Sequence, residues 1–110
     1  MAALVPSLLY IGNDTIGSIY DSPEAAGSYA IIKSINGTNT SNATTTFSLH
    51  ILVGGAEAAN SNKILNEAEL TVGNTLAYDT SIVVPADSSL YITQPGNAVT
   101  VTISGVEYVA

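Results

Sequence analysis

Residues 29–53 read YAIIKSINGTNTSNATTTFSLHILV and carry the strongest secondary-structure signal in the chain. Within residues 45–53 apolar and polar side chains alternate, with Phe47 and Leu49 in one set and His50 in the other. Successive side chains of a β-strand point to opposite faces, so this alternation indicates a strand with one buried face. We therefore expect Phe47 and Leu49 to face the core and His50 to face outward.

The preceding half of this stretch predicts a second strand. Residues 29–35 are mostly apolar, and the insert that follows them, residues 36–43, consists of Asn, Gly, Thr, Ser and Ala. Two strands joined by turn residues indicate an antiparallel hairpin. We place the turn at residues 40–43, because this position gives two strands of comparable length. The alternative register has its turn at Asn36-Gly37, which is a strong turn signal in its own right.

The rest of the chain continues this pattern of short apolar segments separated by turn residues, with a long loop predicted at residues 54–62, directly after the strand that ends at Val53. The further predicted strands are residues 8–11, 15–20, 63–72, 75–79, 81–84, 90–93 and 99–109. About eight or nine short strands at this spacing are typical of an all-β fold with antiparallel sheets. We predict a β-sandwich of the jelly-roll or a related Greek-key type. The residues expected in its core are Phe47, Leu49, Ile51, Leu70, Val83, Ile92, Val101 and Ile103.

The length of 110 residues corresponds to one domain, residues 1–110. Residues 1–7 precede the first predicted strand and contain Pro6, a residue tolerated on edge strands. We expect this segment to form an extended arm, or an edge strand along a neighbouring subunit. The same segment lacks the basic residues of a signal peptide, and no stretch approaches the ~20 apolar residues of a membrane span.

Charge is scarce in this chain and strongly one-sided. Only 10% of the residues are charged, against about 25% in an average domain, and the net charge is −7, with Lys33 and Lys63 as the side-chain cations. Binding nucleic acid requires several basic side chains, and an anionic membrane repels an acidic chain. We therefore expect neither as a direct partner. With no cysteine, disulfides and thiolate zinc sites are excluded.

Two groups of residues are catalytic candidates. His50 is the one histidine, so a Ser-His-Asp arrangement would have to use it, but its mid-strand position favours a surface or subunit-contact role. Glu67 and Glu69 share one side of a predicted strand, a placement that a pair of catalytic carboxylates in glycoside hydrolysis would also require. Without tryptophan, and with dispersed tyrosines, we expect them instead to be solvated charges that block edge pairing. We predict no enzymatic activity and no catalytic residue.

Neither a metal site nor a cofactor site is predicted. The isolated turn residues Asn13, Asp14, Asp79 and Asp87 do not have the spacing of a calcium-binding loop. The pair Gly54-Gly55 lacks the basic residue and helix start that a phosphate site needs, so we interpret it as a loop hinge.

Four segments taken together resemble a known group of proteins. They are YAIIKSI (residues 29–35), LAYDTSIVVPA (76–86), LYIT (90–93) and VTVTISGVEY (99–108). In this order they are similar to small β-sandwich structural proteins of tailed bacteriophages, over residues 8–109. The most particular piece is the closing SGVEY.

This resemblance implies a non-enzymatic virion protein, with no catalytic, cofactor or metal residue to carry over. Such proteins include head decoration (cement) proteins, which are usually trimeric at local threefold axes of the capsid. The function expected first is therefore a capsid decoration protein, made in the host cytoplasm. It would form homotrimers on the capsid surface and stabilise the head by bridging major capsid subunits. The alternatives are a small tail, neck, baseplate or fibre component of the virion, and a carbohydrate-binding or adhesin module.

Overall fold

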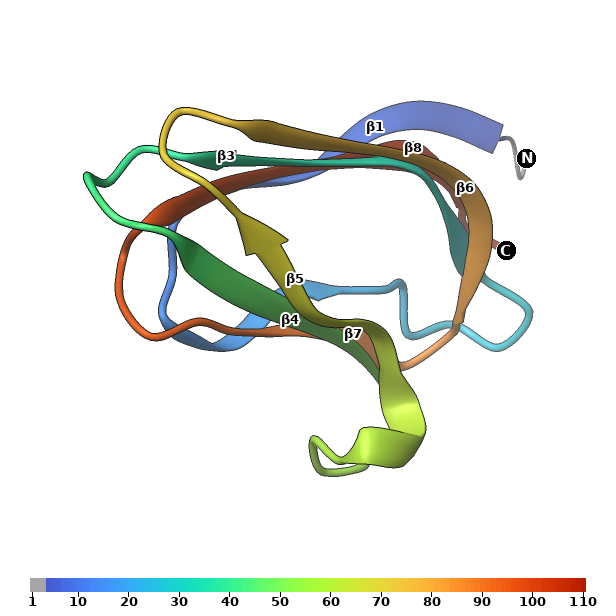
Figure 1. Cartoon of the computed structure of the whole chain (residues 1–110). Coiled ribbons are helices and arrows are strands. Elements are labelled where there is room, and N and C mark those ends of the chain that lie inside the picture. The colour runs from blue at the N-terminus through green and yellow to red at the C-terminus, as the bar shows by residue number, and fades with distance from the viewer. Residues whose placement is uncertain (1–3) are drawn as a thin grey trace.

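Eight β-strands form two four-stranded sheets that lie face to face (Figure 1). The computed structural model describes residues 4–110. The elements are β1 (Leu4–Gly12), β2 (Ile16–Asp21), β3 (Tyr29–Asn39), β4 (Thr45–Val53), the 3₁₀ turn η1 (Asn60–Asn62), β5 (Lys63–Leu70), β6 (Thr75–Pro85), β7 (Ser88–Thr93) and β8 (Val99–Tyr108). Within residues 4–110, no helix has the length and apolar character that a bilayer crossing requires.

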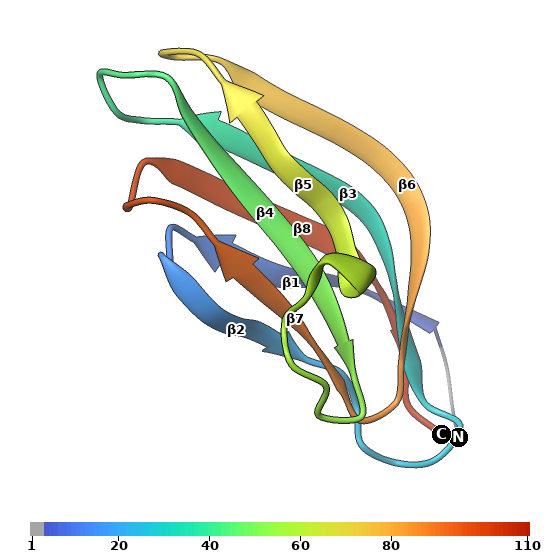
Figure 2. The same cartoon turned by 60° about the horizontal axis from the view of Figure 1, so that its bottom comes forward.

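The strand order is that of a jelly roll. The first sheet has the order β1-β8-β3-β6 and the second sheet the order β2-β7-β4-β5, as both views show (Figure 2). β1 pairs with β8, β2 with β7, β3 with β6 and β4 with β5, all antiparallel, so the chain resembles one long hairpin whose two arms are rolled up together. Eight strands in two such sheets define the double-sheet jelly roll, and the predicted all-β sandwich is confirmed.

The predicted hairpin of residues 29–53 is wrong, although both of its strands exist. β3 lies in the first sheet and β4 in the second, so the polar insert carries the chain across the sandwich between them. The turn does lie at residues 40–44, and Asn39 holds it. The Asn39 side chain is buried, donates to the carbonyls of Ala43 and Leu70 at 2.8 and 3.0 Å, and accepts from the Ser41 amide at 2.9 Å. Turn chemistry thus specifies where the chain bends but not which strand it joins.

Gly37 lies inside β3 and forms no turn, so its role is to leave room. A Cβ atom at this position would lie 2.9 Å from Cε1 of the Phe47 ring, which comes from β4 in the opposite sheet. Glycine within a strand often marks such a close approach. The missing side chain lets the ring of Phe47 fill the space between the two sheets.

Most of the predicted core is confirmed. Phe47, Leu49, Leu70, Ile92, Val101 and Ile103 are buried, and Ile51 is partly buried against them. The prediction for Val83 is wrong, because Val83 exposes 55% of its surface while Val84 is fully buried. Both belong to an uninterrupted apolar run, 82–84, which has no alternation to indicate the inward face. The register decides it, since Val84 lies opposite the buried Ala30.

Most predicted strands have boundaries that differ by a few residues from the observed ones. Residues 75–79 and 81–84 form one strand, β6, whose pairing with β3 is interrupted by a bulge. The predicted arm is wrong for Leu4 to Ser7, because these residues belong to β1 and pair with β8 of the same chain at the edge of the first sheet; residues 1–3 lie outside the described residues. The predicted loop 54–62 contains η1.

Candidate functional site

His50 is buried, so its prediction as a surface histidine is wrong. The loop of residues 54–62 folds back over the outer face of β4 and leaves His50 only 4% exposed. The Nδ1 atom lies 3.1 Å from the carbonyl oxygen of Ala59 and 2.8 Å from Oδ1 of Asn62, and the ring meets Tyr91 edge-on at 5.8 Å. These contacts fasten the loop to the sheet, which is a structural task.

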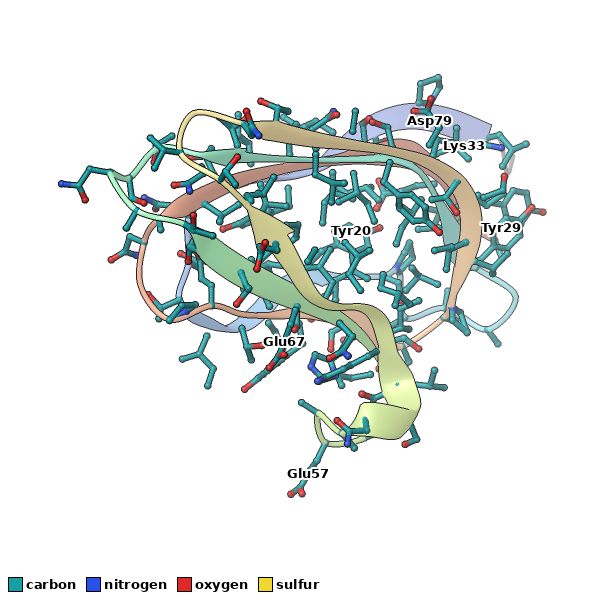
Figure 3. The ribbon with its side chains drawn as sticks, in the orientation of Figure 1. Tyr20, Tyr29, Lys33, Glu57, Glu67 and Asp79 are labelled. Atoms are coloured by element: carbon teal, nitrogen blue, oxygen red, sulfur yellow. The ribbon has the colours of Figure 1, made fainter. Side chains whose placement is uncertain are left out.

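Ser48, the neighbour of His50 on the same face of β4, is also engaged. Its hydroxyl accepts a hydrogen bond from the Glu67 amide at 2.8 Å, at a bulge of β5 where Glu67 has φ 48°. Glu67 and Glu69 are both exposed on β5, an edge strand of the second sheet. Figure 3 shows Glu67 pointing away from the sandwich. Charged side chains and a bulge on an edge strand hinder pairing with another chain.

The predicted turn residues do not meet at one place. Asn13 and Asp14 lie between β1 and β2, Asp79 lies in β6, and Asp87 lies in the turn before β7. Gly54 and Gly55 both have positive φ and open the loop that covers His50. Among residues 4–110, no group of three or more His, Cys, Asp or Glu side chains is placed to hold a metal ion.

One hollow does bring acidic residues together, which the sequence did not indicate. It lies beside the loop 54–62, and its lining includes Asp21, Glu24 and Asp87. Asp87 is distant in the chain from Asp21 and Glu24, and the three meet because the end of β2 and the β6–β7 turn lie side by side there. The Ser22 hydroxyl ties the two segments by donating to the Pro85 carbonyl at 2.6 Å.

The carboxylates are distributed unevenly over the two sheets. The second sheet and the loops between strands hold most of them, whereas the strands of the first sheet carry Asp79 and Glu107. Glu107 points inward and accepts a hydrogen bond from the hydroxyl of Tyr20, which crosses from the second sheet. Burial of Tyr20, together with this carboxylate, raises the pKa of its hydroxyl. Asp79 is thus the acidic side chain of the first sheet that faces solvent.

The outer face of the first sheet is apolar at one end, where β3 and β6 meet the end of β8, and polar farther along, where Ser34, Ser104 and Thr102 point outward. Outward positions align in rows across the four strands, one row containing Leu4, Tyr108, Tyr29 and Pro85 and the next Pro6, Val106, Ile31 and Val83. β1 continues the apolar surface along the edge. We call the following set the apolar face: Leu4, Pro6, Leu8, Ile11, Tyr29, Ile31, Val83, Pro85, Val106 and Tyr108.

Several members of the apolar face are strongly exposed. Leu4, Leu8, Ile11 and Val83 each present more than half of their surface. The rings of Tyr29 and Tyr108 stack with their centroids 5.1 Å apart in the terminal row of the face. Large exposed apolar patches on folded domains occur at protein–protein interfaces, membrane contacts and ligand grooves.

Two charges of opposite sign border the apolar face. Lys33 and Asp79 are both exposed, and Figure 3 shows them close together on the outer side of the first sheet. The Lys33 ammonium donates to the Ser81 hydroxyl at 2.7 Å. The face is therefore electrically neutral as a whole, whereas the opposite side of the molecule is acidic.

Comparison with protein-family models gives no match, and no curated protein matches the chain in sequence. The structure by itself defines the class as an antiparallel jelly-roll β-sandwich with one neutral, apolar outer face and one acidic side. Of the residues considered from the sequence as catalytic or metal-binding candidates, Asp79 borders this face but does not belong to it. The members of the face come from four strands that only the register brings together.

Proposed function

We propose that the protein is a non-enzymatic virion subunit, a decoration protein that attaches to a phage capsid and stabilises it. The observation that supports this proposal best is the two-sided surface of the jelly roll. A subunit that bridges others needs two contact surfaces, and here an apolar face and an acidic side lie on opposite layers. Jelly rolls are also recurrent folds of viral capsid proteins.

The acidic side offers a means of attachment. Glu57, Glu67 and Glu69 are exposed on the side of the second sheet, and Figure 3 shows Glu57 and Glu67 pointing away from the first sheet. These carboxylates suit basic patches on a capsid shell. Contacts of this type favour rapid association and weaken as salt rises.

Stabilisation would follow from buried area. A shell under internal pressure fails where neighbouring capsomers separate from each other. A subunit bound across the boundary between two capsomers must dissociate before they can separate. An interface of standard size buries about 1,600 Å² in total, and many copies multiply its effect over the shell.

The experiment uses particles of the phage that encodes the protein, prepared with and without its gene. We expect purified protein to co-sediment with the particles that lack it and to raise the temperature at which they release DNA. Binding should weaken between 50 and about 500 mM salt. Failure to bind, or labelling by antibody on the tail and not on the head, contradicts the decoration role, and the second result supports the tail-component alternative.

Two variants that change the net charge in opposite directions test whether the acidic side attaches the protein to the capsid. Replacing Glu57 and Glu69 by Gln should weaken attachment. Lys63→Gln, a change on the same strand as Glu69 that makes the protein more acidic, should strengthen it. Weakening by both changes would indicate a general disturbance of the surface, not attraction between charges.

A further inference from the structure

We propose that the apolar face is a self-association interface on which a second copy of this chain packs, sheet against sheet, across a twofold axis. The biological role of this interface rests on the virion function proposed above. Its evidence is the register, burial and charge of the first sheet.

The distribution of charge identifies a second copy as a fitting occupant. A chain with a net charge of −7 repels its own kind wherever its carboxylates meet. The apolar face avoids this repulsion, because Asp79 beside it is matched by Lys33 and the other exposed carboxylates lie in the second sheet or in loops. Packing through the first sheet directs the acidic sides of two copies away from each other.

The pair of charges is self-complementary. In a twofold interface the same patch serves both partners, so residue i of one copy meets residue j of the other and j meets i. Lys33 and Asp79 lie on neighbouring strands, with Asp79 opposite Ser34, the residue next to Lys33. Lys33 of each copy can therefore face Asp79 of the other. An ammonium has three donors, so the hydrogen bond to Ser81 leaves capacity for this contact.

A face-to-face contact fits this sheet better than an edge-to-edge one. β1 is a long edge strand without charged residues, but Pro6, its third residue, lacks the N–H that continued pairing would need. A stable interface also uses roughly 20–30 residues a side, which is the scale of the whole outer face and not of one edge. Packed sheets approach to about 10 Å, a separation that buries side chains such as Leu8 and Val83.

The twofold arrangement differs from the trimer that the phage resemblance implies. A threefold ring is built from heterologous contacts, in which one surface of a subunit meets a different surface of the next. Such a ring would need an apolar counterpart on another side of the molecule, whereas the contiguous apolar surface described above lies on one sheet. The mass of the oligomer distinguishes the two arrangements.

The test measures the mass of the purified protein by sedimentation velocity and by light scattering after gel filtration, over a range of concentrations. We expect a dimer that persists at high salt, because its contact is mainly apolar, whereas attachment to capsids weakens. Val83→Asp should raise the dissociation constant of the dimer at least ~10-fold, since it buries a charge without a partner. The matched control is Val53→Asp, in which a valine of equal exposure, 55%, is changed in the second sheet.

A charge swap tests the twofold register directly. Lys33→Glu alone and Asp79→Lys alone should each weaken the dimer, and the double variant should restore it, with circular dichroism confirming that all three remain folded. A monomer at every concentration, a trimer, equal effects of Val83→Asp and Val53→Asp, or no restoration in the double variant would overturn the proposed interface. These results come from purified protein alone, so they are distinguishable from a failure to bind capsids.

Discussion

Replacing Gly37 by Ala tests how closely the two sheets approach. The added methyl group would lie 2.9 Å from Cε1 and 3.0 Å from Cζ of the Phe47 ring, and 3.3 Å from Cγ1 of Val99. Gly37, Phe47 and Val99 are all buried between the two sheets, so the added methyl group crowds the ring against its neighbours. Overpacking of this kind costs about 1–3 kcal/mol, and Gly→Ala recovers about 0.4–1 kcal/mol from the unfolded chain. We expect the free energy of unfolding to fall by about 1–2 kcal/mol.

Urea unfolding followed by far-UV circular dichroism measures this loss, with the slope of the transition unchanged. Gly96→Ala is the control, because a Cβ there meets nothing within 4 Å, and it should leave stability unchanged or slightly higher. Phe47→Leu in combination with Gly37→Ala should relieve the crowding, giving a coupling energy of at least ~0.5 kcal/mol. Strictly additive effects, or a Gly37→Ala variant as stable as the native protein, would refute the reasoning.

Two further predictions concern side chains that join distant parts of the sandwich. Burial and the Glu107 carboxylate raise the pKa of the Tyr20 hydroxyl, so the native state keeps this proton at a pH of ~10 and above, where the unfolded chain loses it. The free energy of unfolding should therefore fall as the pH rises above ~10, and it should fall less steeply in Tyr20→Phe. Urea unfolding across that pH range measures both slopes. His50→Ala removes the contacts to Ala59 and Asn62, so amide hydrogen exchange in residues 54–62 should accelerate while exchange in β8 stays slow, and equal acceleration in both would contradict the fastening role.

Local pattern predicted the strands well and their partners poorly. The alternation around Phe47 and Leu49 reflects burial on one face of β4, which any sandwich would impose, so both core positions were predictable. The partners of β3 and β4 were not predictable, because the polar insert after Asn39 can turn the chain back along the same sheet or carry it across to the other sheet. Only the complete set of strand pairs decides between the two paths, since β3 pairs with β6 and β8, far along the chain.

The candidate interface could not be predicted from the sequence, also because it depends on which strands pair. Its members alternate with core residues on four strands, and an outward Ile31 looks the same in sequence as an inward Ile32. A bulge after Ile32 shifts the alternation again. Burial of His50 was equally hidden, because the loop that covers it carries no apolar signal. Composition did indicate one general feature: the chain has too few charges to cover its surface, and apolar side chains such as Leu8 and Val83 are exposed on it.

The position of β8 has a consequence for how the protein is made. β8 lies between β1 and β3 in the first sheet, yet it is the last of the eight strands to leave the ribosome. Until residues 99–108 emerge, β1 has no partner strand and the first sheet is split by a gap. Val106 and Tyr108 of the apolar face arrive with the same strand. A nascent chain therefore cannot present the complete apolar face, so the self-association proposed above would begin only after synthesis has passed β8, and premature assembly on a crowded polysome would be avoided.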